Sequence, residues 1–351
     1  MGLLDRVNAR WVEADHEVTD SQWKNTRLIA LGLLLLGPHL PRLGAVADVP
    51  DALINSRLRF PAGFLATGPS ALLIALALAT VVSVGLALGG FRVRIFGTAA
   101  ALLLLVGNSI LFSVENKIVH HQWVMYVVFV MSLTIWSGRD RVLGVWSPRL
   151  LLSWLIAWGL MTSALVKVRG GWLNLGQSVV RSQLDVQAVA QGRFPSVAQV
   201  LRDLLGESFL WEFADYATVG LELGLVVLVL RPSWFRGGLL LLIGFHIAIL
   251  LTLGISFVAI LPAYVPFFAE VMPRRSLPTV SAEALVAGVL SVVALVAVAA
   301  SIPDATAWLL SWVPLEPEVV GGVALLLLPA LFLRKVALQA TGRFEQVATP
   351  A

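Results

Sequence analysis

Long uninterrupted blocks of apolar residues recur along this chain, and many of them are long enough for a helix to cross a lipid bilayer. A run of about 18 or more apolar residues is the usual sign of such a span. Charged residues make up only 13% of the 351 residues, whereas a soluble domain carries roughly 25%. One soluble domain of this length could not bury so many apolar helices. The sequence therefore predicts an all-α, polytopic transmembrane helical bundle.

About ten spans follow from the apolar blocks, and the basic residues between them give an orientation. Lysine and arginine gather in every second connection, for example at Arg92 and Arg94, which predicts that these connections and both termini are cytoplasmic. The expected spans are 28–46, 70–89, 96–114, 119–137, 149–167, 212–230, 237–253, 255–271, 284–302 and 318–334. The expected parts are a cytoplasmic N-terminal segment over 1–27, a transmembrane domain over 28–275, two additional helices over 276–335 and a cytoplasmic tail over 336–351. The expected location is the plasma (cell inner) membrane.

Two segments depart from a simple series of spans. Residues 237–271 form one apolar stretch with basic residues at both ends, so we expect a hairpin of two short helices broken near Gly254 or Pro262. Residues 168–211 form the largest polar segment of the chain. Within it, apolar side chains follow helical spacing at Val197, Val200, Leu201, Leu204 and Leu205. This pattern predicts an interfacial helix that lies on the outer bilayer surface or covers a cavity.

Composition excludes several classes of function. The chain has no cysteine, which excludes disulfides, thiol catalysis and thiolate metal sites. No His-Glu-x-x-His run and no paired Glu-x-x-His motif is present, so we predict no metal site. No basic helix or aromatic platform for nucleic acid is present either. The net charge of +4 is therefore interpreted as membrane topology.

Ionisable residues within or at the ends of the expected spans are the candidates for chemistry, because a bilayer normally excludes them. They are Lys167, Glu222, His246, the pair His120 and His121, and His39. A lysine that is shielded from water loses its proton more easily and can act as a base. Structural interpretations stay open for all of them. Lys167 could extend to the interface, Glu222 and His246 could join helices, and the histidine pair could simply lie at the interface.

Several motifs occur in order along the chain. Arg59-Phe60-Pro61 precedes the second expected span, and ENKIVHHQWVMY opens the fourth with His120 and His121. The segment TSALVKVRGGWLNLG has a lysine, a tryptophan five residues later and then a glycine. Together these motifs resemble those of the HTTM-domain family, the bacterial relatives of the transmembrane domain of vitamin K-dependent γ-glutamyl carboxylases. In that family Asn-His stands at the positions of His120 and His121, and the marked positions of the late helices fall on Glu222, His246 and Phe257.

The resemblance implies an activity and a cofactor. In the carboxylases the matching lysine is the base that deprotonates vitamin K hydroquinone, so Lys167 would be that base and His121 would support it from the neighbouring helix. His246 and Glu222 complete the implied catalytic set. The implied cofactor is a reduced quinone of the vitamin K type. The residues implied to bind it are His120, Trp172, Arg59 and Phe257.

Three classes of function follow from the sequence. The first is a quinol-dependent enzyme that performs base-initiated oxidation or carboxylation at an outer-facing cavity. The second is a non-catalytic membrane subunit that binds a lipid or small molecule, and the third is a transporter, which is less favoured because no internal repeat is evident. The first class predicts that Lys167→Ala abolishes turnover while expression and thermal stability stay unchanged. It also predicts that Lys167 and His121 lie close together at the outer face.

Overall fold

The computed structural model describes residues 2–36, 79–80, 82–87, 92, 95–100, 102–103, 146–191, 196–206, 208–253 and 260–275. Within these residues the fold is all-α, with helices joined by turns and no strand. The expected spans 119–137, 284–302 and 318–334 and the expected tail 336–351 lie outside the described residues. The spans expected over 28–46, 70–89 and 96–114 are described only in part.

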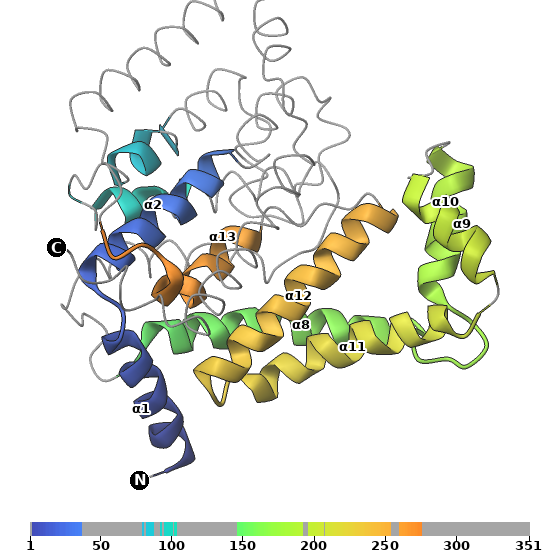
Figure 1. Ribbon diagram of the computed structural model, residues 1–351, viewed down its shortest axis with the longest axis horizontal. Coiled ribbons are helices and arrows are strands. Elements are labelled where there is room, and N and C mark those ends of the chain that lie inside the picture. Colours follow the sequence, from blue (N-terminus) through green and yellow to red (C-terminus); the bar gives the residue numbers. More distant parts are fainter. Residues whose placement is uncertain are drawn as a thin grey trace, which may run out of the picture.

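The longer described elements are seven helices, followed by one short helix and a 3-10 helix (Figure 1). They are α1 (Leu3–His16), α2 (Asp20–Leu36), α8 (Pro148–Arg169), α9 (Val179–Gln191), α10 (Ser196–Leu205), α11 (Leu210–Leu228), α12 (Pro232–Leu253), α13 (Leu261–Tyr264) and η4 (Val265–Val271). The pair α8 and α11 runs side by side, and α12 packs against α11. α1 lies at one end of α8, whereas α9 and α10 lie at the other end.

Three of the expected spans are present as long helices. α8 covers 149–167, α11 covers most of 212–230 and α12 covers 237–253. The helix α8 begins at Ser147, whose hydroxyl accepts a hydrogen bond from the Leu150 amide at 3.3 Å, and Pro148 occupies the first turn. Among the described helices, Pro148–Arg169 and Pro232–Leu250 are long and apolar enough to cross a membrane.

The span expected over 255–271 differs from a regular helix in its described part. Residues 261–264 form the single turn α13, and 265–271 continue as the 3-10 helix η4. Proline removes a backbone donor and favours a break in a helix, and this segment contains Pro262 and Pro266. Phe268 also has non-helical backbone angles (φ −111°, ψ 18°). The break therefore lies within the expected span, and Tyr264 and Glu270 are placed by irregular backbone.

The N-terminal segment packs against the bundle instead of standing apart from it. Trp11 of α1 is buried and donates a hydrogen bond from Nε1 to the Val229 carbonyl oxygen at 2.8 Å. Its ring meets Phe235 and Phe267 edge-on, each with 5.9 Å between ring centroids. These contacts join α1 to the turn between α11 and α12 and to η4. A helix of mixed polarity is thus part of the core at this end of the molecule.

Candidate functional site

The C-terminal end of α8 places Lys167 and Trp172 side by side. The amide of Trp172 donates to the Lys167 carbonyl oxygen at 3.1 Å, and the amide of Gly171 donates to the Val168 carbonyl oxygen at 3.2 Å. This pair of hydrogen bonds is a Schellman motif, which needs a left-handed residue just beyond the helix. Gly171 supplies it with a φ of 82°. The chain therefore turns back, and Lys167 Nζ lies 5.2 Å from the centre of the Trp172 ring.

Lys167 forms an ion pair with Glu222 of α11. The Nζ atom donates to Oε1 of the carboxylate, across the interface of the two helices that pack most extensively. Only 19% of the Lys167 side chain and 5% of the Glu222 side chain are exposed. The second oxygen of Glu222, Oε2, is buried and makes no hydrogen bond within the described part of the chain. The hydroxyl of Ser163, one turn before Lys167, lies beside the same carboxylate.

A second polar pair lies close to the first. His246 of α12 and Tyr264 of α13 are both buried, and Nε2 of the imidazole lies 3.2 Å from the tyrosine hydroxyl oxygen. The charge of Lys167 acts on His246, and the charge of Glu222 acts on Tyr264. Four polar groups from four helices therefore lie close together in a largely buried cluster. We call Lys167, Glu222, His246 and Tyr264 the buried polar cluster.

The cluster contains three of the residues singled out from the sequence and one that was missed. Lys167, Glu222 and His246 belong to it, and Trp172 lies against it. Tyr264 was not singled out, although it is one of only three tyrosines in the chain and lies in an apolar segment. The positions Arg59, His120, His121 and Phe257 lie outside the described residues, so their approach to Lys167 stays a prediction. No group of three metal-binding side chains occurs among the described residues.

A polar cavity of about 440 Å³ adjoins the turn that follows Lys167. Its lining runs from Gly170 through the loop to Asp185 of α9 and includes Asn174, Arg181 and Ser182. Asp215 of α11 accepts hydrogen bonds from the amides of Val179 and Val180 at 2.9 and 3.0 Å, which ties the start of α9 to α11. The loop and α9 therefore form a polar wall above the end of α8.

The helix predicted within residues 168–211 is present as α10, and Val200 and Leu204 lie on its exposed side. The preceding helix α9 was not predicted. Its one buried apolar side chain among those described is Leu184, which packs with Trp211. One buried apolar side chain does not produce the helical spacing of apolar residues from which a helix is predicted.

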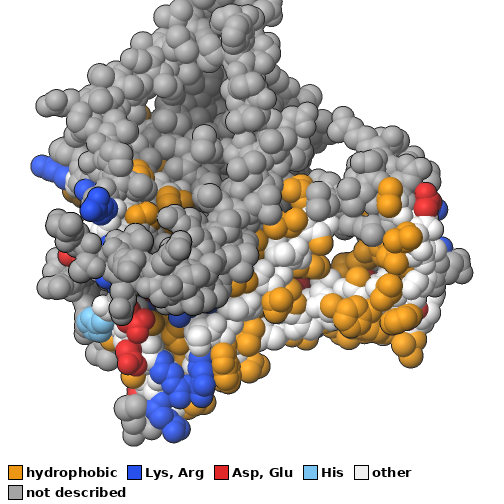
Figure 2. All heavy atoms as spheres, viewed as in Figure 1, with side chains coloured by type: hydrophobic (Ala, Val, Ile, Leu, Met, Phe, Trp, Pro, Cys, Tyr) orange, Lys and Arg blue, Asp and Glu red, His pale blue; other side chains and the backbone are white. Residues whose placement is uncertain are grey.

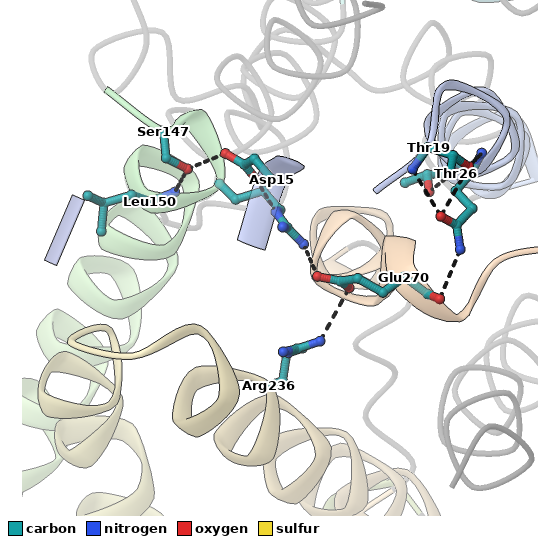
Figure 3. A network of polar contacts seen from close by, with 9 residues as sticks. Asp15, Thr19, Thr26, Ser147, Leu150, Arg236 and Glu270 are labelled. Atoms are coloured by element: carbon teal, nitrogen blue, oxygen red, sulfur yellow. Dashed lines mark hydrogen bonds and ion pairs between the residues drawn. The ribbon is translucent and has the colours of Figure 1, made fainter. Parts of the chain in front are cut away.

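A network of charged groups at the other end of the molecule was also missed (Figure 3). Arg149 is 1% exposed and donates through Nε to Asp15 and through Nη1 to Glu270, the latter at 2.7 Å. Arg236 of α12 lies 3.4 Å from the other oxygen of Glu270. Arg149 lies in the first turn of α8, where it joins α1 to η4.

We predict that Gly171→Ala will disturb the end of α8. A left-handed backbone costs a residue with a β-carbon about 1–2 kcal/mol, and a β-carbon here would approach Asn174 Nδ2 to 2.8 Å. The turn should open and Trp172 should move away from Lys167, which altered tryptophan fluorescence and a lower melting temperature would report. Gly220→Ala is the matched control, because a β-carbon there meets no atom within 4 Å. Equal melting temperatures for both variants would contradict the assignment.

No protein-family model, no curated protein and no solved structure matches this chain.

Proposed function

We propose that this chain is a multi-pass plasma-membrane protein of the HTTM type, with about ten spans and both termini in the cytoplasm. The two long apolar helices among the described residues support the membrane placement. So do large apolar side chains that face outward along α8, α11 and α12, since Trp158, Val166, Val227 and Leu241 are all more than half exposed. Figure 2 shows apolar side chains spread along this side of the molecule. Lipid is the environment in which such a surface is stable.

The chemistry we propose is base-initiated oxidation or carboxylation at the outer-facing end of α8, and the buried Lys167–Glu222 pair carries this proposal. An ion pair that is removed from water is costly unless further groups compensate it. Buried ionisable groups with a specific charge partner concentrate at functional sites. Here one carboxylate oxygen has no hydrogen bond within the described residues, so the pair retains an acceptor that a ligand could use.

In this proposal the two residues of the ion pair have different roles: Glu222 accepts the proton and Lys167 stabilises the resulting charge. Lys167 Nζ already donates to Oε1 of Glu222, so Oε2 of the carboxylate is the open acceptor. Glu222 Oε2 would accept a proton from a bound ligand. The Lys167 ammonium would stabilise the negative charge that remains on the ligand. The buried His246–Tyr264 pair would extend the hydrogen-bonding surface on the far side of the cluster.

A reduced quinone fits the chemistry of this group of residues. When bound, it supplies an acidic hydroxyl group and the electrons for an oxidation. The Trp172 ring beside Lys167 offers an aromatic face, and Glu222 Oε2 offers a buried acceptor. Arg59, His120, His121 and Phe257 would complete the quinone site in this proposal.

The test is turnover by purified protein in vesicles with a reduced menaquinone. We expect oxygen uptake by the wild-type protein, and its loss in Glu222→Gln and in the paired variant Lys167→Met/Glu222→Gln. The general contribution of a positioned acid or base is about 10²–10⁴-fold in rate. Arg169→Gln is the control, because this neighbouring cation is exposed and no ion pair is formed by it in the described structure. Full activity in folded Glu222→Gln protein would refute the proposed role.

A non-catalytic membrane subunit that binds a lipid or small molecule is the second candidate. It is favoured by the pairing of the four groups with one another, because Lys167 pairs with Glu222 and His246 pairs with Tyr264. Native mass spectrometry distinguishes the two. A bound isoprenoid quinone that is lost from the Lys167 variant favours the enzyme. A stoichiometric protein partner, with no quinone and no oxygen uptake, favours the subunit.

A further inference from the structure

The apolar stripe of α1 continues past the edge of the bundle. Leu3, Leu4, Val7, Trp11 and Ala14 are spaced so that they share one face of the helix. The last three are buried against the protein, whereas Leu3 is 62% and Leu4 is 56% exposed. The bundle therefore covers only the C-terminal part of the stripe. Two large apolar side chains at its N-terminal end continue the same face and are exposed.

The position of α1 shows in which direction its apolar stripe faces. The amide of Ser147, just before α8, donates to Asn8 Oδ1 at 2.8 Å, and Trp11 contacts the turn between α11 and α12. α1 therefore lies across the ends of α8, α11 and α12, and its buried face is turned toward the bodies of these helices. In Figure 1 its N-terminal end points away from the other described helices. If α8 and α12 cross a bilayer, α1 lies in the plane of the bilayer surface with its apolar stripe toward the lipid.

The polar side of α1 contains arginines, as expected for a helix that lies in the plane of the bilayer surface. Arg6 and Arg10 are exposed and lie one turn apart, alongside Asp5 and Glu13. Asp5 is engaged at the start of the helix, where it accepts a hydrogen bond from the Gly2 amide at 2.9 Å. Figure 2 shows Lys and Arg side chains gathered at this end of the molecule. Arginine at the level of the headgroups attracts anionic lipid.

The neighbouring turn between α11 and α12 has the composition of a membrane interface. Arg231 and Trp234 are both exposed there, and the guanidinium carbon lies 4.5 Å from the centre of the tryptophan ring. Tryptophan is enriched at the level of lipid headgroups. This turn, which α1 contacts through Trp11, therefore has the features of a membrane interface.

We propose that the N-terminal turn of α1 is a lipid-binding anchor in the inner leaflet. Leu3 and Leu4 insert among the acyl chains, and Arg6 and Arg10 bind the headgroups of anionic lipids. The proposal rests on the membrane placement of α8 and α12 proposed above, but not on any chemistry at Lys167. Lipid is the occupant that fits, because an apolar stripe continuing toward the bilayer and flanked by arginine is the pattern of an interfacial helix.

The natural absence of cysteine allows a direct test by site-specific labelling. Single variants Leu3→Cys, Ala9→Cys and Leu241→Cys would carry an environment-sensitive fluorophore on the full-length protein in phosphatidylcholine–phosphatidylglycerol vesicles. Ala9 is exposed on the opposite side of α1, and Leu241 is exposed near the middle of α12. We expect lipid-borne spin labels to quench positions 3 and 241 several-fold more strongly than position 9. A water-soluble quencher should give the reverse order.

The outcomes separate this proposal from the others. Water access at position 3, with position 241 protected by lipid, would overturn the anchor alone. Water access at position 241 would overturn the membrane placement and the anchor together. Protection of position 3 from both quenchers would indicate a protein contact and also contradict the proposal.

Arg6→Glu/Arg10→Glu in the Leu3→Cys background should weaken the lipid quenching in phosphatidylglycerol vesicles and have little effect in pure phosphatidylcholine. Equal loss in both would contradict the role of the charges.

Discussion

Lys167→Met should lower the free energy of unfolding by about 3–5 kcal/mol, because it leaves the carboxylate of Glu222 buried without its cation. Glu222 is only 5% exposed, so water cannot replace the lost ammonium. This expectation corrects the one based on the sequence, in which removal of Lys167 leaves thermal stability unchanged. Equilibrium unfolding in mixed detergent micelles, with tryptophan fluorescence as the signal, would measure the change.

The double variant Lys167→Met/Glu222→Gln should recover much of this loss. Replacing both charges removes the unpaired carboxylate, so the two single changes should couple by about 2 kcal/mol. Arg169→Met serves as the control, since an exposed side chain of this kind usually changes stability by less than about 0.5 kcal/mol. Strictly additive losses for Lys167 and Glu222 would show that the pair does not form.

The helices around the cluster could be predicted because their signal is local. α8, α11 and α12 each contain an apolar run of nearly span length, and such a run is sufficient to identify them. α1 could not be placed in the same way. Its stripe of Val7, Trp11 and Ala14 has helical spacing, but mixed polar composition around it also fits a segment free in the cytoplasm. Long-range contacts distinguish the two, such as those of Trp11 with Val229 and of Asp15 with Arg149.

Three of the four members of the cluster could be named from the sequence, but their pairing could not. Lys167 and Glu222 were singled out because a charge in an apolar helix needs a partner. They are separated by 55 positions, and no local rule selects this pair from the other ionisable residues. Tyr264 escaped notice because a neutral phenol in an apolar segment is inexpensive to bury. The place of Trp172, in contrast, follows from the Gly170–Gly171 turn that returns the chain toward Lys167.

Arg149 shows what a topology rule leaves out. Basic residues near the ends of spans mark the cytoplasmic side, but the rule does not say which carboxylates they pair with. Arg149 is enclosed by Asp15, Glu270 and the ring of Trp23, whose centre lies 5.5 Å from the guanidinium carbon. A planar group with five donors can satisfy two carboxylates at once. Its role is therefore to join segments that are distant in the sequence.

Arg149→Met should have an effect as large as that of Lys167→Met, at about 3–5 kcal/mol, because it strands Glu270 and partly exposed Asp15 without the cation between them. The loss should appear first as release of α1, since Arg149 and Ser147 both hold Asp15, the latter through a 2.5 Å hydrogen bond. Limited trypsin digestion would report this as faster cleavage after the exposed residues Arg6 and Arg10.

The matched control is Arg236→Met. This arginine also faces Glu270, but it is 23% exposed and lies 3.4 Å from the carboxylate oxygen. Exposed ion pairs are worth at most about 1 kcal/mol, so this partly exposed contact should contribute less than the Arg149 network, and α1 should stay protected from trypsin. If the two variants lose equal stability, or if Arg149→Met protein keeps α1 protected, the network does not hold the N-terminal helix in place.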